Sequence, residues 1–287
     1  MHYLLALFSA FFYSLNQIYN KRLTLLLGSL PSLVVVYLFL TLFDGLLCLL
    51  FGDFSLPNLR AVVELLFLSV VGALSIFFLF ESFKKLPVGV AITLANFSPI
   101  FLTLLVFLTK GTVPKPTKLV LIVLLILTLP LFFEDTNQKV DRKYIFYPLI
   151  TAFGWGLFGL EVFKLVNDYG LSPFTVAFYS SLFMWLIFLF SCLWVCEIKN
   201  LQKKLRNKTV LKWALLSGVY TSLGFILSVY AFKGATPQEA PVIEALFTFT
   251  TPLGTLTSFL LLGERLTKRQ LLGVSISFSL LLMFFLV

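Results

Sequence analysis

The sequence predicts an all-α integral membrane protein, with ten transmembrane helices arranged as two inverted five-helix repeats. Hydrophobic residues make up 59% of its 287 residues and charged residues only 12%, which is too little polar surface to cover a water-soluble globule. The apolar residues come in runs close to the roughly 20 residues that a helix needs to cross a bilayer. Similar features also recur at a separation of about 150 residues along the chain.

Clusters of charged residues, Pro and Gly divide the sequence into ten apolar spans. The runs lack the alternation of barrel strands, and backbone groups in lipid must be bonded within their own segment, so each span is expected to be a helix. The first run is expected to be a true helix and no cleaved signal, because the basic pair Lys21 and Arg22 follows it without a small-residue cleavage site. The spans cover residues 3–20, 31–51, 60–83, 88–108, 117–133, 144–165, 172–196, 210–232, 238–262 and 268–287.

Polar and small residues recur at helical spacing within four of these spans. A position that faces lipid gains nothing from such a side chain, so each stripe is expected to face another helix or a cavity. The stripe of the eighth span is typical of close helix packing, whereas those of the first and ninth contain amides or an acid and fit a cavity equally well. The stripes comprise Ser9, Tyr13, Asn16 and Asn20; Gly89, Thr93, Asn96 and Thr103; Ser217, Thr221, Gly224 and Ser228; and Ala240, Glu244, Thr248, Thr251 and Thr255.

Two segments that lead into the fourth and ninth spans read alike and indicate an internal repeat. Residues 82–89 and 231–237 each place Phe-Lys at the end of an apolar helix, and each leads to a span that is expected to be broken by a Pro, Pro99 or Pro252. The halves, residues 1–138 and 139–287, would enter the membrane in opposite senses because five helices is an odd number. Inverted repeats are typical of secondary transporters, whose substrate site lies near the midplane between the repeats.

Three motifs resemble the drug/metabolite transporter superfamily, specifically its ten-helix EamA-type branch. Residues 261–273, Leu-Leu-Gly-Glu-Arg-Leu-Thr-Lys-Arg-Gln-Leu-Leu-Gly, are similar to the signature loop between that family's last two helices. The spacing from Ser82 to Pro99 is similar to the family's pattern, and Asn16 and Lys21 resemble its first-helix motif. The resemblance covers the whole chain, although the first half has Lys110-Gly-Thr-Val-Pro-Lys in place of the Gly-Glu-Arg loop. It implies transport, commonly export, of small metabolites such as amino acids.

The second half departs from the first by running about four residues longer between Ala231 and Pro252. Four residues exceed one helical turn, so the ninth helix should start earlier or carry a bulge or an unwound turn. We place this distortion between Thr248 and Pro252, because Thr hydroxyls can bond the carbonyl groups that a Pro leaves free.

Acids within the spans are candidate functional residues, because a charge at the bilayer centre costs about 3 kcal/mol on insertion scales. Glu244 lies on the polar stripe of the ninth span and is a candidate for substrate or proton binding, with a structural partner to a basic residue as the alternative. Glu161 lies three residues before Lys164, which predicts an ion pair near the helix end; the alternative is an inward acid that binds a cation. Asp44 has no basic residue near it in the sequence and needs a partner or a proton.

Uncharged side chains in the central spans could bond to a substrate or stack on it. They need no cofactor, and no metal-binding motif accompanies them. These candidates are Tyr13, Asn16, Gln17, Asn96, Trp155, Tyr220, Thr248 and Thr251.

The composition argues against other classes of protein. The only histidine is His2, so neither a Ser-His pair nor a His-based zinc site can be built, and we expect no enzyme. The net charge of +9 comes from Lys and Arg at the ends of apolar runs, which favours lipid head groups over nucleic acid as the partner. No filter-like repeat of a channel is present. A component of a flippase for lipid-linked sugars or lipid head groups, or a membrane assembly protein, remains the alternative to a secondary transporter of small solutes that could be coupled to protons.

The distribution of basic residues bears on location and orientation. We expect a multi-pass protein of the cell (inner) membrane of a prokaryote. Only 6 of the 22 Lys and Arg residues fall on the side of the amino terminus, so the positive-inside rule places both termini outside. The resemblance implies cytoplasmic termini, and the two expectations conflict. The 6 residues are Arg60, Lys110, Lys115, Lys118, Lys164 and Lys233.

Overall fold

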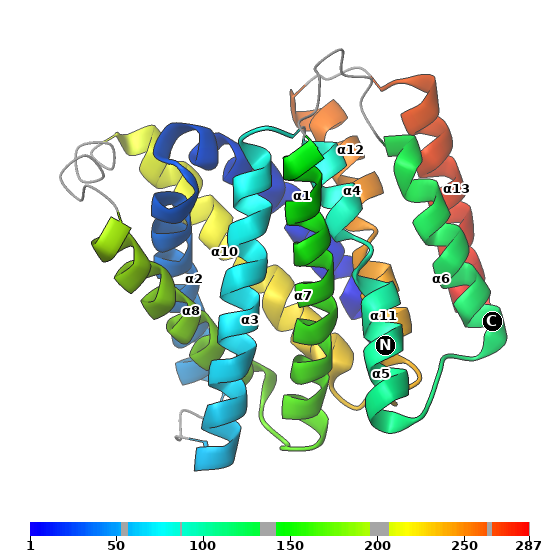
Figure 1. Cartoon of the computed structure of the whole chain (residues 1–287), viewed down its shortest axis with the longest axis horizontal. Helices are drawn as coiled ribbons and strands as arrows, with labels where there is room; N and C mark the ends of the chain where they lie inside the picture. Colours follow the sequence, from blue (N-terminus) through cyan, green and yellow to red (C-terminus); the bar gives the residue numbers. More distant parts are fainter. Residues whose placement is uncertain (53–56, 87, 133–141, 196–206, 263–265, 287) are drawn as a thin grey trace.

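The computed structural model describes the chain except for residues 53–56, 87, 133–141, 196–206, 263–265 and 287 (Figure 1). Every regular element in the described ranges is a helix, and 7 helices are long and apolar enough to cross a membrane. The protein therefore has a membrane helical fold. The ten-helix count and the repeat stay predictions, and the boundary at residues 138 and 139, most of the basic loop after residue 195 and the Gly-Glu-Arg of the signature loop lie outside the described residues.

The described helices follow one another along the chain. They are α1 (His2–Leu27), α2 (Ser29–Phe51), α3 (Leu59–Phe83), α4 (Val88–Ala95), α5 (Ser98–Lys110), α6 (Pro116–Thr128), the 3-10 helix η1 (Leu129–Phe132), α7 (Arg142–Asn167), α8 (Pro173–Val195), α10 (Lys208–Phe232), α11 (Ala240–Phe247), α12 (Thr250–Leu262) and α13 (Lys268–Leu286).

The first helix is longer than predicted, because its basic pair does not end it. The Lys21 ammonium donates a hydrogen bond to the carbonyl of Leu86 at 2.9 Å, and the Arg22 guanidinium lies over the ring of Trp213 at 5.4 Å. Both cations thus find partners within the protein while the helix continues beyond them. It ends at Gly28, whose φ of 90° is a conformation that glycine adopts without the steric cost of a Cβ.

The fourth and ninth spans are each broken into two helices. The ninth is interrupted at Thr248 and Phe249, which confirms the predicted irregularity, and the fourth is interrupted at Asn96 and Phe97, just before the Pro99 that was expected to break it. The hydroxyls of Thr248 and Thr250 donate to the carbonyls of residues 245 and 247 at 2.6 and 2.5 Å, and not, as expected from the sequence, to the Thr248 carbonyl that Pro252 leaves without its helical donor.

The extra residues of the second half are not the cause of the break. Helix α3 ends at Phe83 and α4 begins at Val88, whereas α10 ends at Phe232 and α11 begins only at Ala240. Most of the additional length therefore lies in the connection before α11. Because Pro99 and Pro252 both lack an N–H near the start of the helix that follows each break, loss of a backbone donor is the feature that the two breaks share.

Helices from the two sequence halves pack against each other, so the centre of the molecule is built from both. Helix α1 packs on α10, α2 on α8, and both α3 and α5 pack on α7. Helices α6 and α13 lie together at one edge of the bundle, at the right of Figure 1. This arrangement leaves the two broken helices near the middle, between α1 and α7.

Small residues allow the helices of the two halves to approach closely. A Cβ placed on Gly218 of α10 would lie 2.6 Å from the Cβ of Phe39 in α2, and one on Gly156 of α7 would lie 2.8 Å from the Cβ of Phe101 in α5. The Ser9 hydroxyl of α1 also donates to the carbonyl of Gly224 in α10 at 2.7 Å. Part of the eighth-span stripe therefore serves close packing, as predicted.

Candidate functional site

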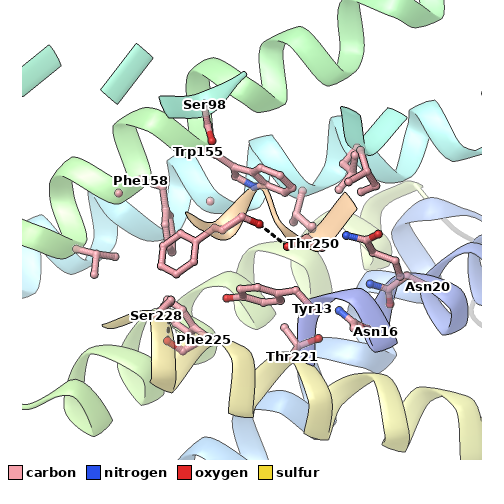
Figure 2. A pocket seen from close by; sticks show the side chains of 18 of the residues that line it. Tyr13, Asn16, Asn20, Ser98, Trp155, Phe158, Thr221, Phe225, Ser228 and Thr250 are labelled. Atoms are coloured by element: carbon pink, nitrogen blue, oxygen red, sulfur yellow. Dashed lines mark hydrogen bonds between the residues drawn. The ribbon is translucent and has the colours of Figure 1, made fainter. Parts of the chain in front are cut away.

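A cavity of about 170 Å³ lies in the centre of the bundle, between helices from both halves (Figure 2). Every described helix except α6, η1 and α13 contributes to its lining. An apolar protein cavity of about 150 Å³ accommodates benzene, so this cavity has room for a small organic solute. Its walls are largely aromatic and aliphatic, with a few polar groups, which is the usual composition of a ligand site.

The wall formed by α1 and α10 carries amide groups. The Ser217 hydroxyl lies 2.5 Å from Oδ1 of Asn16 and 2.6 Å from Oδ1 of Asn20, and it can donate its single proton to one of them at a time. Because this hydroxyl engages the oxygen atoms, the amide N–H groups remain to bind an acceptor on a ligand. Asn16, Asn20 and Thr221 lie near one another in Figure 2, at some distance from Ser98.

Glu244 of α11 supplies the acid of the cavity. Its side chain is 6% exposed, and Oε1 accepts a hydrogen bond from the hydroxyl of Ser98 at 2.6 Å. Ser98 is the first residue of α5, so the break in the fourth span brings a helix start to this carboxyl group. Gly159 of α7 leaves the space that Oε2 needs, because a Cβ at this position would lie 3.1 Å from that atom.

No basic side chain accompanies Glu244 among the described residues that line the cavity. Across the described ranges the ion pairs involve other acids, so the alternative that Glu244 serves as the structural partner of a basic residue receives no support there. A single carboxyl group in an otherwise uncharged cavity can bind an ammonium group or a proton.

The two helix breaks are bonded to each other beside the cavity. The Asn96 amide donates to the hydroxyl of Thr251 at 2.7 Å and to the carbonyl of Thr248 at 3.3 Å. Pro252 cannot donate to this carbonyl, and Asn96 therefore provides a replacement donor from the other half.

The predicted cavity stripe of the ninth span is thus wrong for three of its members. Glu244 lines the cavity, as do Asn16 and Asn96. Thr251 is engaged by Asn96, Thr248 donates its hydroxyl to a carbonyl in its own helix, and Ala240 is fully buried in the core. The break changes the helical phase, so Thr248 and Thr251, which lie at and beyond it, no longer share the face of Glu244, whereas Ala240 lies before the break and packs in the core.

Aromatic side chains form much of the remaining wall. Tyr13 of α1 and Trp155 of α7 are drawn on opposite sides of the cavity in Figure 2. Phe158 of α7 lies against Phe225 of α10, with ring centroids 5.6 Å apart. Gln17, which follows Asn16 on α1, also reaches the cavity. Tyr13, Trp155 and Gln17 therefore all lie where the sequence analysis expected them.

Glu161 and Tyr220 are not among the cavity-lining residues. Glu161 is buried and lies 3.3 Å from Lys164, which confirms the predicted ion pair. Lys164 also pairs with Glu64 of α3 at 3.0 Å, a partner that is about 100 residues distant in sequence and could not be found by spacing. Tyr220 stacks beside Phe12 and Tyr19 instead.

Several polar residues of the lining were not chosen from the sequence. Thr221 and Ser228 belong to the eighth-span stripe, which was interpreted as packing, and Asn20 belongs to the first-span stripe. Ser98 directly precedes Pro99, where the fourth span was expected to be broken, and it was still not chosen. Ser181 carried no sequence signal. Nowhere in the described ranges do three or more His, Cys, Asp or Glu side chains cluster as a metal site would require.

Comparisons with known proteins agree with this geometry. The sequence model of the EamA-like transporter family matches residues 1–133 and 142–286. A protein of Archaeoglobus fulgidus named "Uncharacterized transporter" is 23% identical over 202 residues, which are 68% of this chain and 65% of that protein. The matched region thus spans less than two thirds of that relative. A solved crystal structure superposes with a TM-score of 0.78 at 11% identity, covering 98% of this chain and 94% of the other, and shows a shared fold alone.

Proposed function

The chain belongs to the EamA-like transporter family, and from this premise we propose that it is a secondary transporter that exports small organic metabolites, such as amino acids or related amines. It is a multi-pass membrane protein, and its family and its relative indicate a transporter in place of an enzyme. The observation that carries the proposal is the central cavity, whose described lining combines one acid from the second half, Glu244, with amides from the first half. Alternating access would move this cavity from one side of the membrane to the other.

The polar groups of the cavity fit a substrate with an amino group. Glu244 can accept hydrogen bonds from an ammonium group, while the amides of Asn16, Gln17 and Asn20 can donate to a carboxylate. The aromatic walls suit the apolar part of such a molecule. The volume of about 170 Å³ favours a small solute over the alternative of a lipid-linked sugar or lipid head group.

Proton coupling follows from the isolation of Glu244. Without a basic partner in the described lining, its negative charge would remain uncompensated within the bundle while the protein changes conformation. A proton or a cationic amine can neutralise it, and exchange of one for the other couples export to proton entry. The Ser98 hydroxyl can serve either form, because a hydroxyl can both donate and accept.

Uptake by proteoliposomes over a range of pH tests the role of Glu244. The Glu244→Gln variant keeps the shape of the side chain and loses its charge, so coupled transport should be abolished while thermal unfolding shows a folded protein. Glu244→Asp should retain partial activity with a shifted pH optimum. Glu239→Gln is the matched control, since it removes an acid from the connection before α11 that is not part of the cavity lining.

Unchanged transport and pH dependence in Glu244→Gln would remove this residue from the mechanism and leave Glu161 as the next acid to test. The same liposomes with a labelled lipid head group distinguish the alternative, because a flippase component would relocate the lipid and leave the soluble solute where it is.

By the charge count we place the termini outside, and a cysteine-accessibility label at Lys208 checks this orientation.

A further inference from the structure

A second acid, Asp44, is buried away from the substrate cavity, where α2 meets α8 and α10. Its side chain is 0% exposed, and the hydroxyl of Ser222 in α10 donates to its Oδ1. Oδ2 has no hydrogen-bond partner among the described residues, and no described Lys or Arg forms an ion pair with it. A buried carboxyl oxygen without a partner lowers the stability of the folded protein, which indicates that this group is kept for a function.

Further oxygen atoms surround this carboxyl group. Thr41 lies three residues before Asp44 on the same face of α2, and its hydroxyl is also buried with no hydrogen-bond partner in the described structure. Ser181 of α8 is near enough to interact with the Asp44 carboxyl group, although its hydroxyl also donates to the carbonyl of Phe178 at 3.0 Å. Three helices thus bring a carboxyl group and three hydroxyls to one place.

We propose that Asp44, Thr41, Ser181 and Ser222 form a binding site for a sodium ion. Carboxylate and hydroxyl oxygens are hard ligands, of the kind that bind alkali and alkaline-earth cations. One carboxylate balances a single positive charge, whereas a divalent cation would leave an unpaired charge in the lipid core.

The same atoms argue against a proton as the occupant. A proton on Oδ2 would neutralise the carboxyl group but would not explain why the buried hydroxyl of Thr41 also lacks a partner among the described residues. A cation instead uses the unpartnered oxygens of Asp44 and Thr41 together. The phenols of Tyr13 and Tyr37 interact electrostatically with the carboxyl group, and neither carries a positive charge.

The site is connected to the substrate cavity through shared residues. Ser181 lines the cavity, and so do Tyr37 and Leu40, which lie on α2 close to Thr41. Tyr13 lies within electrostatic range of both Asp44 and Glu244. A sodium ion could therefore enter from the cavity, and its charge would influence the substrate site across this tyrosine.

Thermal unfolding of the purified full-length protein tests sodium binding without any assumption about transport. The measurement compares sodium chloride with choline chloride at constant total salt. An ion that binds only the folded state raises the unfolding temperature with its concentration, so the wild-type protein should be stabilised by sodium and not by choline. Asp44→Asn should lose this response, and Thr41→Val should require a several-fold higher sodium concentration for half of the effect.

Thr93→Val provides the matched control. Thr93 is also a buried threonine whose hydroxyl has no hydrogen-bond partner among the described residues, but it lies on α4, and its variant should respond to sodium as the wild type does. Equal unfolding temperatures in sodium and choline would overturn the proposal, as would a Thr41→Val variant with wild-type response. If acidification in choline stabilises the wild type and sodium adds nothing, Asp44 binds a proton and the sodium site is wrong. Thr41→Val keeps the test decisive even if Asp44→Asn fails to fold.

Discussion

The contact between the two helix breaks can be tested by replacing Asn96 with leucine. This change keeps a side chain of similar size and removes both donors, which the structure places on the Thr251 hydroxyl and the Thr248 carbonyl. Asn96 is only 4% exposed, so water cannot readily replace the lost bonds. The variant should therefore be less stable than the wild type.

The expected loss follows from the two bonds. A hydrogen bond between neutral groups contributes about 0.5–1.5 kcal/mol. The bond to the Thr248 carbonyl is long, at 3.3 Å, and this carbonyl keeps a second donor in the backbone N–H of Thr251 at 3.0 Å. We therefore expect a loss of about 1–2 kcal/mol in the free energy of unfolding, which corresponds to a fall of roughly 2–6 °C in Tm.

Thermal unfolding of Asn96→Leu beside Thr93→Val measures this effect. Thr93 lies one turn earlier on α4, and its buried hydroxyl has no partner among the described residues, so valine there should cost nothing. An Asn96→Leu variant with the Tm of the wild type would refute the view that the two breaks stabilise each other through this amide. A fall in both variants would point to the packing of α4 instead.

Two further outcomes are expected outside the cavity. Gly218→Ala should destabilise the protein by about 1–3 kcal/mol, because the new Cβ would lie 2.6 Å from Cβ of Phe39. Gly254→Ala is the control and should leave stability unchanged, because the nearest atom to its new Cβ is 3.6 Å away. Equal denaturation curves for the two variants would contradict this prediction. Burial alone would raise the pKa of Glu239, but two hydrogen bonds from Thr236 hold this pKa below its usual range. A carboxyl group whose pKa is lowered by folding stabilises the folded state at neutral pH, and this stabilisation is lost as the pH falls through that pKa. The stability of the wild type relative to Glu239→Gln should therefore decline below about pH 4. A stability difference that does not change with pH would contradict this prediction.

The sequence alone determined the class of the molecule. Long apolar runs have no stable alternative to helices in lipid, so the fold class followed from hydropathy and length. The stripe of Tyr13 and Asn16 on the first span and the isolated acid Glu244 were likewise visible, because a polar side chain in such a run needs a partner or a cavity. Of the polar residues that line the cavity, the sequence identified Tyr13, Asn16, Gln17, Asn96, Trp155 and Glu244.

Tertiary structure decided what lies opposite each of these residues. Ser98 reaches Glu244 across 146 positions, and Glu64 reaches Lys164 across 100, distances over which periodicity carries no information. Pro99 predicted a break in the fourth span, but the sequence did not show that Asn96 at this break bonds to the break of the ninth span. Once both helices break, the phase of each following segment changes, and this is why Thr248 and Thr251 bond within the protein while Glu244 alone of the predicted stripe of its span faces the cavity. The periodicity of the sequence describes a continuous helix, whereas the site is built at the two places where the helices are interrupted.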